Sequence, residues 1–113
     1  MTLAAAALNT LAQAFATAYP WLSIHTTGTE TTSTGESTAA RVAAGWVVSG
    51  AAATATNKAF TGGAANGPAT RVGYWSAATG GTFGGSETLV GDTTFNAAGE
   101  YTVTSVSETG AAT

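Results

Sequence analysis

The sequence has little of what most protein chemistry requires. Its 113 residues include no cysteine, which excludes disulfide bonds and thiolate metal sites. Only 8% of the residues are charged, where about 25% is usual in a globular protein. The three basic residues are too few to follow a nucleic-acid backbone, so we expect no nucleic-acid partner.

Long apolar runs are also absent. No stretch approaches the roughly 20 apolar residues that a membrane-spanning helix needs, so no membrane partner is predicted. The apolar run from Leu3 to Leu8 resembles part of a signal peptide, but no lysine or arginine precedes it and Asn9 interrupts it. We therefore expect no signal peptide.

The N-terminal segment is predicted to be a helix. Thr2 is a suitable N-cap for a helix that starts at Leu3, alanines favour the helical state, and Pro20 ends it. An alanine-rich helix is marginal alone, so its apolar stripe must pack on the chain's own sheet or on a neighbouring subunit. The predicted interface residues are Leu3, Leu8, Leu11 and Phe15.

The rest of the chain alternates in the manner of β-strands. The pattern is clearest over residues 71–77, where Val72 and Tyr74 share one face. Gly80-Gly81 then predicts a hairpin turn, and residues 84–86 predict a bulge. Strands are expected over residues 21–26, 40–48, 54–61, 71–77, 82–90 and 100–107.

The last of these strands has a regular pattern. Tyr101, Val103 and Ser105 are expected on one face, and Val106 on the other. By contrast, residues 27–38 contain no large apolar side chain, so they are expected to form an exposed loop.

Several short strands separated by turns are typical of an all-β domain. We predict a mainly β fold, a small antiparallel β-sandwich or barrel-like sheet with one N-terminal α-helix. The helix takes residues 1–20, the β-domain that it joins takes residues 21–107, and residues 108–113 form a flexible tail. The predicted core residues are Trp21, Ile24, Trp46, Phe60, Tyr74, Trp75, Phe83, Tyr101 and Val103.

No catalytic, cofactor-binding or metal site is predicted. His25 is the only histidine and has no acid beside it in sequence, so a structural role is favoured over general-base catalysis. No serine lies in a Gly-x-Ser-x-Gly turn, and the carboxylates are scattered. Three tryptophans form either a carbohydrate-binding platform or part of the core, and the core is favoured. They are Trp21, Trp46 and Trp75.

Four segments follow the residue order of a known family. They are residues 22–26, 40–46, 72–83 and 95–104, and the most specific motif is Gly73-Tyr74-Trp75-Ser76-Ala77. In these segments the sequence resembles small virion proteins of tailed phages of actinobacteria. Members are labelled tail-fibre-like or minor structural proteins, and some decorate capsids.

The resemblance implies a non-enzymatic structural protein of the virion, present in several copies. Capsid decoration is the first expectation. A tail or tail-fibre protein is the alternative, and a carbohydrate-binding adhesion module is the third. The implied partners are the major capsid protein or tail proteins of the same virion, and further copies of the chain. No cofactor is implied.

Overall fold

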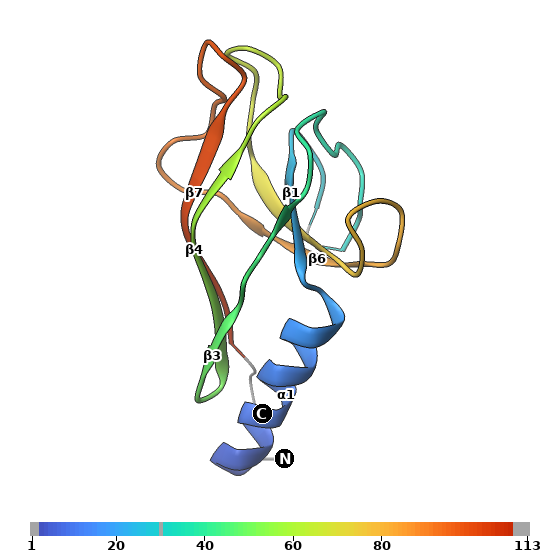
Figure 1. Ribbon diagram of the computed structural model, residues 1–113, viewed down its shortest axis with the longest axis vertical. Coiled ribbons are helices and arrows are strands. Elements are labelled where there is room, and N and C mark those ends of the chain that lie inside the picture. Colours follow the sequence, from blue (N-terminus) through green and yellow to red (C-terminus); the bar gives the residue numbers. More distant parts are fainter. Residues whose placement is uncertain (1–2, 30, 110–113) are drawn as a thin grey trace.

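The computed structural model describes residues 3–29 and 31–109 and confirms the predicted fold class: two antiparallel sheets and one N-terminal helix (Figure 1). The molecule is elongated, 46 Å by 25 Å by 22 Å. Its elements are α1 (Ala5–Ala18), β1 (Trp21–His25), β2 (Val42–Ala43), β3 (Val47–Ser49), β4 (Ala52–Phe60), β5 (Arg71–Trp75), β6 (Phe83–Thr88) and β7 (Tyr101–Thr109).

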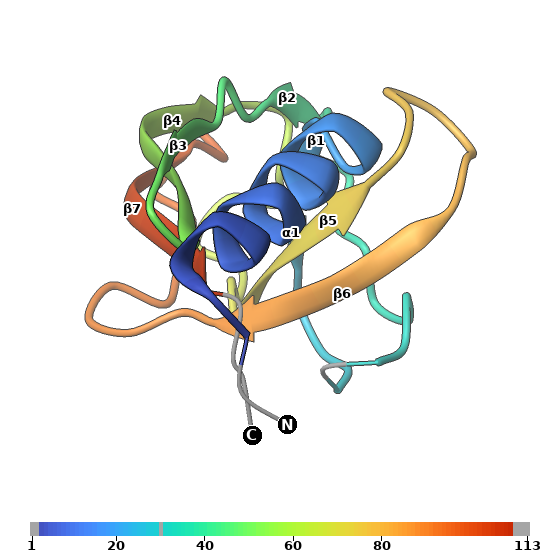
Figure 2. The ribbon, with the colours of Figure 1, turned by 90° about the horizontal axis from the view of Figure 1, so that it is seen from below.

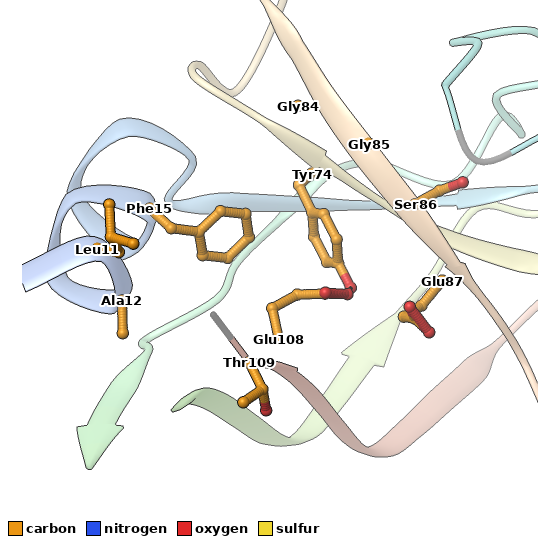
Figure 3. Close-up of a pocket in the computed structure, with 10 residues that line it drawn as sticks. All are labelled: Leu11, Ala12, Phe15, Tyr74, Gly84, Gly85, Ser86, Glu87, Glu108 and Thr109. Atoms are coloured by element: carbon orange, nitrogen blue, oxygen red, sulfur yellow. The ribbon is translucent and has the colours of Figure 1, made fainter. Parts of the chain in front are cut away.

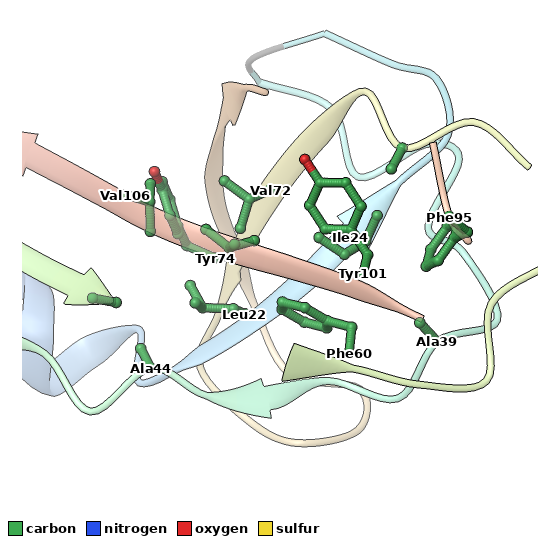
Figure 4. Packing of buried hydrophobic residues seen from close by; sticks show 13 residues of the cluster. Leu22, Ile24, Ala39, Ala44, Phe60, Val72, Tyr74, Phe95, Tyr101 and Val106 are labelled. Atoms are coloured by element: carbon green, nitrogen blue, oxygen red, sulfur yellow. The ribbon is translucent and has the colours of Figure 1, made fainter. Parts of the chain in front are cut away.

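The strands form two sheets that enclose one core. The first sheet has the order β2-β1-β5-β6, and the second has the order β3-β4-β7. At the centre of the first sheet, Leu22 of β1 lies opposite Tyr74 of β5. Side chains from both sheets meet between them, with Leu22 and Phe60 among the fully buried ones (Figure 4).

The predicted core residues fall into four groups. Trp46 is half-buried and packs against the core, whereas Trp75 is buried on the opposite face of the first sheet. Trp21 and Phe83 are half-buried and lie outside the cluster. The others lie in the cluster itself: Ile24, Phe60, Tyr74, Tyr101 and Val103.

The cluster contains further residues that the predicted core omitted. Four of them are alanines, whose small side chains allow the chain to approach the core closely. Their burial shows that alanine contributes to the interior as well as to the helix. The omitted residues are Leu22, Ala39, Ala44, Ala55, Ala69, Val72, Phe95 and Val106.

The single strand predicted over residues 40–48 is wrong. The chain forms β2 in the first sheet, breaks at residues 44–46, and continues as β3 in the second sheet. Gly45 has a φ of 58°, which glycine adopts without strain. The N–H of buried Ala44 donates to the Pro20 carbonyl at 2.8 Å, in register with the β1–β2 pairs, and the chain leaves the first sheet after this bond. The crossing joins the two layers.

The predicted alternation of the last strand is also wrong beyond Val103. Tyr101 and Val103 are buried as expected, but Val106 is buried and Ser105 is exposed. The change occurs opposite Asn57 of β4, which has a φ of 52°. A left-handed residue locally reorients the strand, so the inward-facing positions shift by one on both strands.

Local turn and bulge predictions agree with the structure. Gly80 and Gly81 have φ of 61° and 76° between β5 and β6. The register of these strands shifts between Tyr74 and Trp75, so that Gly84 of β6 has no partner on β5, which is the bulge expected within residues 84–86. A Cβ on Gly84 would lie 2.6 Å from the Tyr19 ring, so glycine is needed there for the helix end to approach.

The element ends differ from the prediction. The helix begins at Ala5 with Ala4 as N-cap and no capping side chain, while the predicted cap, Thr2, lies outside the described residues. Strand β7 runs to Thr109, two residues past the predicted strand end, because it continues to pair with β4. Residues 110–113 of the expected tail lie outside the described residues.

Candidate functional site

Helix α1 is anchored at the open end of the sandwich by one aromatic ring. It lies between the β3–β4 side and the β5–β6 side (Figure 2). The Phe15 ring has its centroid 5.2 Å from that of Trp46, 5.3 Å from that of Tyr74 and 5.6 Å from that of Tyr19. Such pairs add stabilisation beyond simple burial. Phe15 therefore serves the chain's own fold.

The other predicted interface residues are less covered. Leu3 and Leu8 are half-buried, and Leu11 is 48% exposed. The Asn9 side-chain amide donates to the Gly50 carbonyl at 2.8 Å, which ties the helix to the β3–β4 turn. The helix thus packs on its own sheets along one side and leaves Leu11 exposed.

A groove of about 360 Å³ lies beside the exposed part of the helix (Figure 3). Leu11 and Phe15 line it from α1, and Glu87 and Glu108 line it from the two sheets. Its volume is at the lower end of the range for small-molecule sites, about 300–1,000 Å³. The groove combines an apolar helix wall with an acidic strand wall.

A hydrogen bond from a tyrosine hydroxyl links the two sheets in this groove. The Tyr74 hydroxyl donates to Glu108 Oε1 at 2.7 Å. Burial, and then the bond to the Glu108 carboxylate, raise the pKa of Tyr74 above its ordinary value. The phenol therefore stays neutral at physiological pH and acts as a donor. The contact links β5 to the end of β7.

The face of the first sheet that points away from the core between the sheets, here called the outer face, holds a buried chain of hydrogen bonds. Trp75 Nε1 donates to Ser23 Oγ at 2.8 Å, and Ser23 Oγ lies 2.7 Å from His25 Nε2. His25 Nδ1 lies 3.1 Å from the Thr34 carbonyl, which only accepts. Neutral His25 therefore carries its proton on Nδ1, and Ser23 donates to Nε2.

This arrangement resembles a nucleophile–base pair, but substrate has no access to it. Ser23 is 0% exposed and His25 is 1% exposed. Burial lowers the pKa of His25, so the imidazole stays neutral. A Cβ on Gly73, opposite Ser23, would lie 2.5 Å from His25 Nε2, so the pair lies directly against the backbone of the neighbouring strand β5. The geometry supports a structural role for both side chains.

The Arg41 side chain covers part of the outer face of the first sheet. Its guanidinium carbon lies 3.7 Å from the centroid of the Trp75 ring, and its Nε donates to Glu36 at 2.8 Å. Its Nη1 donates to the carbonyls of Ala77 and Gly80 at 2.9 Å and 2.7 Å. One side chain thus joins the residue 27–38 loop, the β5–β6 turn and the tryptophan.

The three tryptophans do not form a single flat platform. Trp46 lies in the aromatic cluster around Phe15, and its Nε1 donates to the Tyr19 carbonyl at 2.8 Å. Trp75 is covered by Arg41, and Trp21, its cross-strand partner, is half-buried. This geometry does not favour the stacking surface on which carbohydrate binding depends.

The hydrogen-bonded group of Ser23, His25 and Trp75 on the outer face was not predicted from the sequence, although one signal for it was present. Ser23 and His25 are two residues apart on a strand, so they share a face, and a strand glycine indicates close approach of another group. Within residues 3–29 and 31–109, no three His, Cys, Asp or Glu side chains lie together as a metal site would require. The same residues form no helix that is both long and apolar enough to cross a membrane.

Comparisons with known protein families, with curated proteins and with solved structures found no match for this chain.

Proposed function

We propose that the chain is a non-enzymatic structural protein of a phage particle that decorates the capsid and attaches to it through α1. The observation that carries the proposal is the position of this helix. It projects from one end of the sandwich (Figure 1), and its Leu11 remains exposed beside an apolar groove wall. The sequence resemblance to small virion proteins supplies the kind of particle.

The burial and complete hydrogen bonding of the interior polar side chains support a structural role. Ser23 and His25, which have the chemistry of a nucleophile and a base, are fully buried and lie against the backbone of β5. In the described part of the chain, no buried side-chain nitrogen or oxygen lacks a hydrogen-bond partner. Such complete pairing is the usual state of polar groups that stabilise a protein interior.

Attachment through α1 rests on apolar contact and is therefore insensitive to salt. At about 1 M salt the screening length is about 3 Å, which removes long-range charge effects but leaves apolar burial. Purified protein is added to particles that lack it, and occupancy is measured at low and high salt. Loss of occupancy at high salt would contradict attachment by apolar contact.

Leu11→Ser is the informative variant, and Val47→Ser is its matched control. Both side chains are apolar and exposed, at 48% and 68%, but Val47 lies on β3 and does not line the groove. Leu11→Ser is expected to weaken attachment by about 1 kcal/mol, a several-fold loss of affinity. Phe15→Ala is unsuitable, because the Phe15 ring also holds the fold together.

The number of copies per particle separates the two positions in the virion. Decoration predicts a copy number that scales with the major capsid protein, whereas a tail position predicts few copies. Gel densitometry of purified particles measures this ratio. A low ratio would overturn decoration in favour of a tail protein.

A further inference from the structure

The two sheets are open toward each other along one side. Strand β6 is the outermost strand of the first sheet and β7 is the outermost strand of the second. A groove of about 280 Å³ lies between them. Its floor is apolar, with Val72, Val103 and Val106 all at least 93% buried, and Val90 on its wall is 90% exposed.

The β7 edge is suited to pairing with a further strand. It is nine residues long, whereas strands of about 5–6 residues are usual. Natural edge strands are commonly protected by lysine, proline or a bulge. Strand β7 contains neither lysine nor proline, and its threonines, valines and tyrosine favour the extended state.

The charge around this edge has one sign. All three basic residues of the chain lie at or before Arg71, and the four later charged residues are acidic. Glu87 and Asp92 lie on the groove. Arg71 is held on the outer face of the first sheet, where its Nε donates to Ser86 Oγ at 2.7 Å and its Nη1 donates to Thr88 Oγ1 at 2.8 Å.

We propose that the β6–β7 groove is a docking site for an extended basic segment of a partner protein. The segment adds to the edge of β7 as a strand, inserts apolar side chains over the floor valines, and places lysine or arginine beside Glu87 and Asp92. Backbone hydrogen bonds supply affinity in such strand addition, and alternate side chains supply selectivity.

The acidic rim argues against two other occupants. A second copy of this chain would bring the same carboxylates to the groove, and like charges in contact weaken association. A drug-sized ligand normally occupies about 300–1,000 Å³, which exceeds the roughly 280 Å³ available. A row of inserted apolar side chains with flanking cations fits the space and the charge.

This inference goes beyond attachment through α1, because it concerns a second groove, which shares Glu87 with the groove beside α1, and a partner of stated chemistry. Contact through α1 is expected to persist at high salt, whereas docking of a basic segment is expected to weaken. If one of these two predictions fails, the other is unaffected. A direct test therefore uses the isolated protein and no particle.

The probe is a short blocked peptide in which valine and lysine alternate. We expect it to bind at low salt, to shift the backbone amide resonances of Thr102, Thr104 and Ser107, and to weaken at least about tenfold between 0.05 M and about 0.5 M salt. The same peptide with alternate backbone amides methylated is expected not to bind, since it cannot extend the sheet.

Protein variants locate the site. Glu87→Gln with Asp92→Asn removes the rim charge but keeps the side-chain oxygen that accepts from the Thr94 N–H. This double variant is expected to lose most of the affinity for the peptide. Glu36→Gln, which removes a carboxylate paired with Arg41 on the outer face of the first sheet, is the control and is expected to bind normally.

Three outcomes would overturn the inference. One is the absence of binding by the valine–lysine peptide to a folded protein. Another is equal binding by a peptide with glutamate in place of lysine, which would show that charge does not select the partner. The third is a dimer in analytical ultracentrifugation that the Glu87→Gln, Asp92→Asn variant alters, which would assign the groove to a second copy.

Discussion

The two faces of the first sheet are both buried, but by different means. Leu22 and Ser23 are neighbours on β1 and are both 0% exposed. Leu22 points into the apolar core between the sheets, whereas Ser23 points outward and bonds to Trp75 and His25. The inner face is covered by another sheet, and the outer face is covered by loops and Arg41.

The difference shows how a small chain can bury both sides of a sheet. A second layer of apolar residues would require more chain than 113 residues provide. The outer face instead uses polar groups that satisfy one another, so little apolar surface is needed. Apolar burial stabilises in proportion to area, whereas a hydrogen-bonded cluster depends on every partner being present.

The largest effect is expected from the inner face. Leu22→Ala should lower the free energy of unfolding by about 2–5 kcal/mol, because it leaves a cavity among fully packed neighbours. That loss is a large part of the roughly 5–15 kcal/mol that stabilises a domain. Urea unfolding followed by tryptophan fluorescence measures it. An unchanged midpoint would show that the two sheets do not close on Leu22.

A smaller but specific effect is expected from the outer face. Ser23→Ala should cost about 1–3 kcal/mol, because Trp75 Nε1 and His25 Nε2 both lose a partner in a buried site. In a Trp75→Phe background the same change should cost less, since one stranded donor is already gone. Equal costs in the two backgrounds would mean that these groups do not act as a network.

The outer face should also make stability depend on pH. His25 has a pKa below 6.5 in the folded state, so below about pH 6.5 the unfolded chain binds a proton that the folded chain does not. Stability is complete above that pH and falls as the pH is lowered, by at most about 1.4 kcal/mol per pH unit.

Urea titrations at several pH values between 7.5 and 5 test this. The His25→Gln variant should be less stable but should show a flatter profile over this range. The same slope in both proteins would assign the dependence to other groups.

The smallest effect is expected from a change of Arg41, the side chain that covers Trp75 on the outer face. Arg41→Lys keeps the charge but loses the planar stack on Trp75 and the two-nitrogen contact with Glu36, which should cost about 1 kcal/mol. Thermal unfolding of the variant beside Lys58→Arg, the reverse exchange at the lysine of the chain, measures the difference. A cost as large as that of Leu22→Ala would mean that the stability of the outer face depends on Arg41 alone.

Local patterns in the sequence predicted much of the fold. The alternation over residues 71–77 and the glycines that follow it were enough to place β5, its turn and the β6 bulge. Each depends on a few adjacent residues, since strand period and positive φ are local properties. The helix and its stop at Pro20 were predictable for the same reason.

Features that depend on distant contacts were not predictable in this way. The alanine-rich segment around Gly45 gives no periodic signal for a crossing between sheets. Asparagine tolerates a left-handed φ, but Asn57 lies within a segment that has the pattern of a strand. Arg41 reaches Trp75 from a remote part of the chain, so its role depends on the fold that it helps to stabilise. The acidic bias after Arg71 was visible in the sequence, but the groove on which it acts was not.

The pairing of strands also sets the order in which the molecule can assemble during synthesis. The centre of the first sheet pairs β1 with β5, and the second sheet pairs β4 with β7, the last strand. Among the described residues, α1 and the β3–β4 and β5–β6 hairpins form from neighbouring segments. Long-range pairing folds slowly, because distant segments must meet before they gain contacts. The chain therefore cannot complete its sandwich until Thr109 has left the ribosome, and cleavage or stalling before that point leaves β4 without its partner.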